Sequence, residues 1–192
     1  KYNLTEDDLI MSQQVGPSLG AEIKFGMIRA LLLAAAVMFI YLGFRFEFGM
    51  SWAAVIALLH DVIILISIYA IFYITVNAPF IAAVLTVFGY SVNATVVIFD
   101  RIRGNLKIMR RSDYAKIANV SVNQTLTRSI NTTLTTLIML VLMYFLGSKA
   151  LKDFAFPLLV GIISGAYSSI FISTPLWVLF KNRAKTKKPI KA

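Results

Sequence analysis

Apolar residues fill five long stretches of this chain, and short polar turns separate them. A helix that crosses a bilayer needs about 20 apolar residues, because each residue advances the helix by roughly 1.5 Å. The pattern predicts an all-α fold, a polytopic membrane helix bundle over residues 25–180. Its five transmembrane helices are expected at residues 25–45, 52–76, 79–99, 124–147 and 154–180.

The composition supports the same class. Of 192 residues, 58% are hydrophobic and only 15% are charged, which is more apolar surface than a soluble domain could leave in water. No stretch is distinct enough to form a separate soluble domain. The chain has no cysteine, which excludes disulfides and thiol chemistry.

Lysine and arginine are distributed unevenly, and this predicts the orientation, because cytoplasmic loops carry an excess of both. They gather in the predicted loop 100–123 and in the tail 181–192, which we therefore place in the cytoplasm. Residues 1–24, with an acidic start, are expected outside. Lys149 and Lys152 make one outer loop modestly basic, against this trend.

The net charge of +10 has an ordinary explanation for a membrane protein. Basic tails set topology and contact anionic lipids, so membrane lipids are expected partners. Nucleic acid is not expected, because no aromatic residues alternate with the basic residues of the tail.

The chain starts at Lys1 without a methionine or a signal-peptide pattern, yet its first span begins on the predicted outer side. We therefore expect a fragment. The full protein would hold an earlier span, six in all, and further extracytoplasmic mass.

A polar stripe along the fourth span is the most informative feature. Arg128 lies in it and stays charged at any relevant pH. Placing arginine inside a membrane costs about 2.5–3.5 kcal/mol unless it reaches water or a partner. Two interpretations stay open. In the first, the Arg128 side chain extends to water at the cytoplasmic boundary or pairs with Asp100. In the second, Arg128 is the fixed positive charge of an ion-coupling site and stabilises the ionised form of a nearby carboxylate. The stripe consists of Gln124, Arg128, Asn131, Thr132 and Thr135.

His60 and Asp61 form a polar pair inside the second span. They either hydrogen-bond neighbouring helices to fix the packing or form a titrating, ion-contacting pair. A metal site is not expected, because the chain has one histidine and metals need several convergent ligands.

Small residues predict where helices approach closely. Gly161 and Gly165 form a small-xxx-small pair in the fifth span, while Gly89, Asn93 and Ala94 share a face of the third. Asp100, Arg101 and Arg103 fall at the cytoplasmic boundary, where charged groups reach water. Residues 102–122 mix basic and apolar side chains and predict an amphipathic helix along the membrane surface.

Several of these segments together resemble the SecF family of the bacterial SecD/SecF export machinery, which is related to resistance-nodulation-division transporters. The resemblance covers nearly the whole chain from Val15. It rests on residues 15–20 (VGPSLG), His60-Asp61, residues 89–105 (GYSVNATVVIFDRIRGN), residues 123–136, and residues 166–171 (AYSSIF).

The resemblance implies an auxiliary subunit of protein export in the bacterial cytoplasmic membrane. Such a subunit pairs with SecD, associates with the SecYEG channel, is linked functionally to SecA, and uses a proton- or sodium-motive force to assist exported preproteins. The family has an intramembrane acid where this chain has Ala94, and an arginine where it has Arg128.

Three hypotheses follow from the missing acid. In the first, an acid of the SecD half carries the ion coupling alone, with Arg128 as its counter-charge. In the second, Asn93, Asn131 and Thr132 bind sodium through neutral oxygens. In the third, His60 and Asp61 are the groups that titrate. The first is favoured, because a hard cation beside a fixed arginine would be repelled.

Two other function classes are weaker. A small-molecule or lipid permease of the same superfamily would act without SecD through a roomy lateral cavity. An intramembrane enzyme would need a nucleophile with a base, or metal ligands on facing helices. The chain offers neither, so neither catalysis nor a cofactor is expected.

Overall fold

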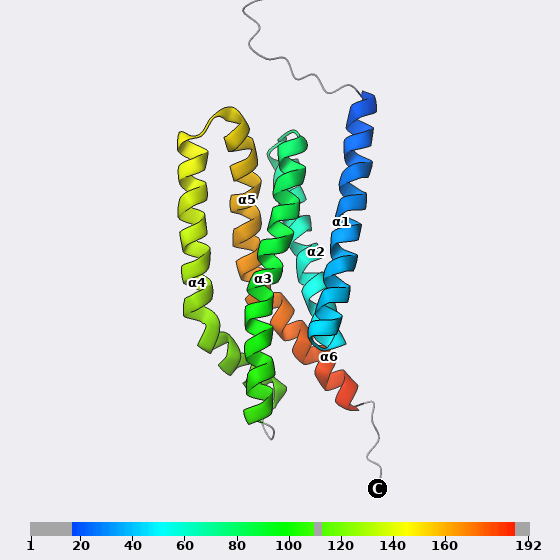
Figure 1. The fold of residues 1–192 in the computed structure, drawn as a ribbon, viewed down its shortest axis with the longest axis vertical. Helices are drawn as coiled ribbons and strands as arrows, with labels where there is room; N and C mark the ends of the chain where they lie inside the picture. Colours follow the sequence, from blue (N-terminus) through cyan, green and yellow to red (C-terminus); the bar gives the residue numbers. More distant parts are fainter. Residues whose placement is uncertain (1–16, 110–112, 187–192) are drawn as a thin grey trace, which may run out of the picture.

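The computed structural model describes residues 17–109 and 113–186, with side chains over 25–109 and 113–184. Most of the expected outer segment 1–24 and half of the tail 181–192 lie outside these residues. Figure 1 shows the helices as rods that run along the long axis of the molecule. They are α1 (Pro17–Arg45), α2 (Phe48–Ile71), α3 (Ala78–Ile108), α4 (Tyr114–Leu146), α5 (Lys149–Ser168), the π-helix η2 (Ser169–Ser173) and α6 (Thr174–Thr186).

Five helical stretches within the described residues are long and apolar enough to cross a membrane. They confirm the predicted all-α bundle of five spans. Helix α3 lies centrally, with α5 and α4 on one side and α2 and α1 on the other, while α6 runs obliquely across one end (Figure 1). We call this the α6 end of the bundle.

The expected cytoplasmic segment 100–123, with its amphipathic helix over 102–122, is largely helical, but it does not form one separate helix. Helix α3 continues to Ile108 and α4 begins at Tyr114. Both helices exceed the 20 or so residues that a bilayer requires, so their amphipathic ends extend past the apolar segment. In Figure 1 the first turns of α4 run obliquely across the α6 end before the helix turns upright.

The expected fifth span, residues 154–180, is divided by η2. Helix α5 changes to π geometry at Ser169, and α6 continues from Thr174 in another direction (Figure 1). Isolated π-turns inside α-helices are uncommon and are often found at functional sites.

Close packing of α5 on α3 depends on two glycines. A Cβ atom at Gly161 would lie 2.3 Å from Cγ2 of Val87, and one at Gly165 would lie 3.0 Å from Cβ of Ser91. The missing side chains let the helices approach, as the small-xxx-small pattern predicts. Gly89 was expected to do the same, but a Cβ there would meet nothing within 4 Å. It lies on the outer face of α3, between Val87 and Ser91, which are the residues that face α5.

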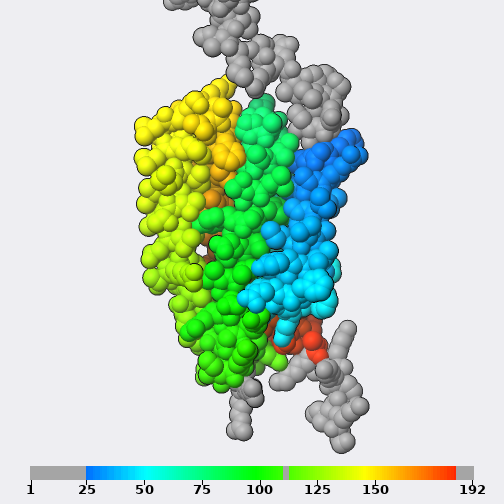
Figure 2. Space-filling view, in the orientation of Figure 1, coloured from blue at the N-terminus to red at the C-terminus, as the bar shows by residue number. Residues whose placement is uncertain are grey.

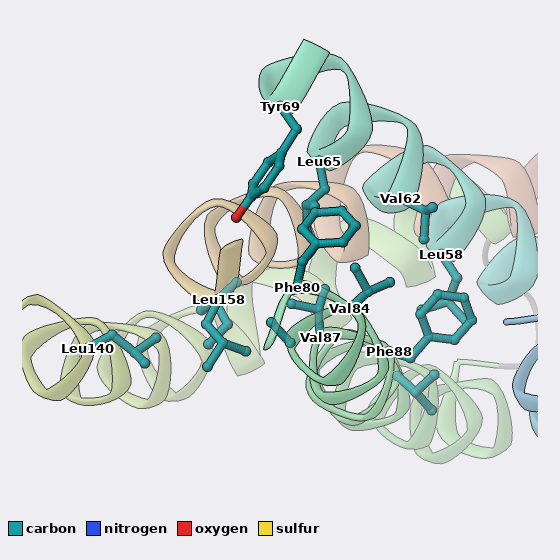
Figure 3. Packing of buried hydrophobic residues seen from close by; sticks show 13 residues of the cluster. Leu58, Val62, Leu65, Tyr69, Phe80, Val84, Val87, Phe88, Leu140 and Leu158 are labelled. Atoms are coloured by element: carbon teal, nitrogen blue, oxygen red, sulfur yellow. The ribbon is translucent and has the colours of Figure 1, made fainter. Parts of the chain in front are cut away.

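Two apolar cores hold the bundle together. One fills the end away from α6, where side chains of α2 and α3 interlock with Leu140 of α4 and Leu158 of α5 (Figure 3). The other lies at the α6 end around the fully buried Trp177. Lipid is as apolar as leucine, so between spanning helices the stabilisation comes from van der Waals contact rather than from removal of water.

Candidate functional site

A buried carboxylate lies where three helices meet. Asp61 of α2 has only 1% of its surface exposed. Its Oδ2 accepts hydrogen bonds from the hydroxyls of Ser91 on α3 (2.7 Å) and Ser168 on α5 (2.9 Å). Its Oδ1 accepts a hydrogen bond from Ser164 on α5 (2.8 Å) and lies 3.3 Å from Nδ1 of His60. We call these five residues the Asp61 cage.

The helices assemble this cage through their spacing. Ser164 and Ser168 are four residues apart, so they lie one above the other on the face of α5 that meets Asp61. Gly165 lies between them against Ser91, and this close approach brings the hydroxyl of α3 within reach of the same carboxylate. The bonds therefore join α2, α3 and α5 at a single point.

Three hydroxyls donate to this carboxylate, and Nδ1 of His60 supplies a fourth donor in the tautomer that carries its proton there; an ionised carboxylate accepts about four hydrogen bonds. The donor set therefore suits the charged form of Asp61. Among the described residues, no lysine or arginine lies within 4 Å of it; the one basic group within that distance is the imidazole of His60. His60 is 31% exposed and therefore links the buried carboxylate to the bundle surface.

The sequence pointed to His60 and Asp61 but not to the serines. Ser164 lies between Gly161 and Gly165, whose spacing predicts only close packing, and serine in a membrane helix commonly bonds a carbonyl of its own helix. The sequence does contain one indication of the cage: two serines four residues apart in one span, and an acid in another span that needs hydrogen-bond donors.

A second polar layer lies next to the cage. The hydroxyls of Thr95 and Ser169 are 3.0 Å apart, and Ser169 also donates to the carbonyl of Gly165 (2.7 Å). Ser169 is the first residue of η2, directly after Ser168 of the cage. The π-turn and the cage are thus continuous.

Ser169 also lines a cavity of about 200 Å³ between α3, α4 and α5. Ala94, the position at which the resemblance implies an acid in related chains, forms part of the same wall. Figure 2 shows the surface hollowed between α3 and α4. The remaining lining is largely apolar, with Ser129 and Thr133 as its polar members.

The structure places Arg128 away from the cage. Its side chain is exposed on α4 and, within the described residues, no carboxylate lies within 4 Å of it. Asp100, one of its two expected partners, instead lies 3.8 Å from Arg45.

The other members of the stripe share this outer surface. Asn131, Thr132 and Thr135 are exposed, and the threonine hydroxyls donate to carbonyls of their own helix at 2.8–3.0 Å. Asn93 is exposed on α3. These residues do not converge on a common point with His60 and Asp61.

The boundary residues make contacts at the α6 end. Arg101 donates to Gln124 of α4 (2.6 Å), and Arg103 donates to the carbonyl of Arg45 (3.0 Å). Lys181 of α6 pairs with Glu47, which joins the end of the chain to the α1–α2 turn. Across the described residues, no three of histidine, cysteine, aspartate or glutamate group as metal ligands would.

The fold and these polar groups define a class: a polytopic α-helical membrane protein with a charged residue buried inside and another on its helix surface. Within that class, the family described as "Protein export membrane protein SecD/SecF, C-terminal" matches residues 3–183. The chain belongs to this family.

Curated relatives agree. The chain is 40% identical over 184 residues to "Protein translocase subunit SecDF" of Thermus thermophilus, covering 96% of this chain and 25% of that one. It is 42% identical over 181 residues to "Protein translocase subunit SecF" of Alicyclobacillus acidocaldarius, covering 93% and 59%. The chain thus spans a quarter to three fifths of these relatives.

A solved structure shows the same fold. A crystal structure of SecDF in a form described as super-membrane-facing matches with a TM-score of 0.82 at 39% identity. The match covers 94% of this chain and 24% of the crystallised one.

Proposed function

We propose that this chain is the SecF-type membrane half of a complex that uses an ion gradient to assist protein export. The observation that carries the proposal is the exposed Arg128 of a spanning helix that has no acidic partner within the described residues. Membership of the SecD/SecF family supplies the context for it.

An arginine facing lipid is unfavourable by about 2.5–3.5 kcal/mol on insertion scales, so this surface needs a cover. The threonine hydroxyls of the stripe are satisfied by their own helix, but the guanidinium is not. A second helix bundle that packs on α4 would remove the stripe from lipid. We propose that the SecD half is this bundle.

The partner must also bring a negative charge. Ala94 cannot supply one, and Asp100 lies nearer Arg45. We therefore propose that a carboxylate of the SecD half faces Arg128, and that its protonation changes the attraction between the two halves. A change in that attraction is a means of moving one half against the other.

The setting follows from the family and the charge pattern. We propose the bacterial cytoplasmic membrane, with the N-terminal end outside and the basic α6 end in the cytoplasm. There the complex would associate with the SecYEG channel, depend on SecA, handle exported preproteins, and contact anionic lipids through its basic residues. We propose a non-catalytic role, in keeping with relatives named as translocase subunits.

The permease alternative has no specific support. The cavity between α3, α4 and α5 holds about 200 Å³, whereas small-molecule sites commonly enclose about 300–1,000 Å³.

The test is Arg128→Leu in the full-length protein, co-expressed with SecD. We expect export of a reporter preprotein to depend no longer on the ion gradient, and co-purification with SecD to weaken. Arg128→Lys keeps the charge and should retain part of both. Lys116→Leu removes an equal charge from an exposed position of the same helix and should change neither. Normal gradient-dependent export by Arg128→Leu would refute the proposal.

A further inference from the structure

The Asp61 cage presents a charge problem of its own, separate from Arg128. The carboxylate is 1% exposed in a spanning helix, and the hydroxyls around it bring hydrogen bonds but no positive charge. Burying an ion is unfavourable even after the protein relaxes, and a compensating charge reduces that penalty. With a neutral imidazole beside it, the pair would carry a net charge of −1 inside the membrane.

The neighbours that could supply the compensating charge are few. His60 faces Asp61 on its own helix and Tyr167 on α5, whose ring centroid is 6.4 Å from that of the imidazole. Helices α3 and α5 otherwise present the serine hydroxyls. No other ionisable side chain of the described residues bonds to the pair.

A metal cation fits this cage poorly. Three hydroxyl oxygens lie 2.7–2.9 Å from the carboxylate oxygens in direct hydrogen bonds, so an ion seated among them would have to part the three helices. Hard cations also take many oxygen ligands at once. A proton needs no such space, and a free imidazole nitrogen can receive it.

We propose that His60 and Asp61 form a proton-binding site within this half of the complex. A hydronium ion at the bundle surface transfers its proton to Nε2 of His60, the nitrogen that does not face Asp61. An O–H bond of the hydronium breaks, an Nε2–H bond forms and a water molecule leaves. Nδ1–H continues to donate to Oδ1 of Asp61, and the charge of the pair changes from −1 to 0. Histidine suits this role because an ordinary imidazole changes its charge in the physiological pH range.

The cage also provides a route from proton binding to movement. Ser168 bonds the carboxylate, and the next residue begins the π-turn that redirects the chain into α6. Ser169 in turn contacts Thr95 and the cavity beside Ala94. When the net charge of the pair becomes zero, the hydrogen bonds from Ser164 and Ser168 to Asp61 weaken. Both serines belong to α5, so this change acts on that helix next to the π-turn. That this movement serves export rests on the proposed function.

The direct test observes the imidazole in the full-length complex, reconstituted in lipid nanodiscs with histidine labelled with ¹⁵N. The His60 signal is identified by its loss in His60→Gln. We expect it to change from neutral to doubly protonated between about pH 8 and 5. In Asp61→Asn, the doubly protonated population at a given pH in this range should be smaller than in the parent, because the carboxylate that stabilises the imidazolium is gone.

Three controls keep the outcome interpretable. Ser164→Ala removes one hydroxyl of the cage and retains the acid, so it provides a second variant if Asp61→Asn does not fold. In Ser164→Ala, the imidazole of His60 should still titrate. Ser129→Ala changes a serine on the cavity wall outside the cage and should titrate as the parent does. Replacing sodium by choline should leave the titration unchanged.

Three results would overturn the site: an imidazole that stays neutral to about pH 5, identical titration in Asp61→Asn, or a response to sodium but not to pH. Export is measured separately. If His60→Gln keeps the parent's pH dependence of export, proton binding does not drive it. Arg128→Leu should leave the titration intact, so failure of the proposed function and failure of this site are distinguishable.

Discussion

Two charged groups within the spans, Asp61 and Arg128, are satisfied in opposite ways. Asp61 lies at the junction of α2, α3 and α5 and receives hydrogen bonds from three serines within its own chain. Arg128 lies on the outer surface of α4, and among the described residues no carboxylate lies within 4 Å of it. The buried charge is satisfied by the fold, whereas the exposed one is, in the proposed function, satisfied by a second bundle.

The two regions also differ in how tightly their helices approach. Around Asp61, Gly161 and Gly165 leave no room for a side chain against α3. Beside the stripe, a cavity separates parts of α3, α4 and α5, and Gly89 faces open space. We infer that the cage region is the rigid part of this half and that α4 is the helix better able to shift. The following changes test that contrast, from the largest expected effect on stability to the smallest.

The largest effect is expected from Gly161→Leu. Its Cβ alone would lie 2.3 Å from Val87, so α5 would be forced away from α3 and the cage would open. Overpacking of this kind costs about 1–3 kcal/mol, and so close a contact with the branched side chain of Val87 places the change at the upper end. Unfolding in nanodiscs, followed by heat or denaturant, measures the loss.

Gly89→Leu is the matched control on the outer face of α3. With nothing within 4 Å, the isolated chain should keep its stability within about 0.5 kcal/mol. Equal losses in the two variants would mean that the contrast between a tight and an open face is wrong.

Asp61→Asn should give the next largest effect. The amide keeps the shape but turns one carboxylate oxygen into an NH₂ donor, which then faces hydroxyls placed to donate. Hydrogen bonds to a charged group contribute about 1.5–3 kcal/mol each, and part of that is recovered when the serines rotate toward their own helix. We expect a loss of about 1–3 kcal/mol, measured by the same unfolding experiment.

How much of this could be predicted depends on which interactions the sequence encodes locally. The five spans follow from runs of apolar residues, and Gly161 with Gly165 follows from a four-residue spacing on one helix. The contact expected at Gly89 is not found within this chain, because spacing shows which residues share a face but not which face meets a neighbour. The serine cage could not be predicted, because it depends on the rotation of three helices about their own axes.

A smaller effect is expected from Ser164→Ala. It removes one of two bonds to Oδ1 while His60 still faces that oxygen. Interhelical hydrogen bonds between membrane helices average about 0.6 kcal/mol and reach about 1.7. We expect a loss of about 1 kcal/mol. Ser129→Ala, outside the cage, should cost less, and the reverse order would show that the cage does not join the helices.

The smallest effect on the chain alone is expected from Arg128→Leu. Its side chain is exposed, so the isolated chain in nanodiscs should change by no more than about 0.5 kcal/mol, or gain slightly because leucine suits lipid. In the complex with SecD, the variant should instead lower the stability, because it leaves a partner carboxylate without its counter-charge. Comparing the unfolding of the chain alone with that of the complex measures this reversal. A large loss in the chain alone would mean that Arg128 already has a partner within its own half, and the contrast with Asp61 would disappear.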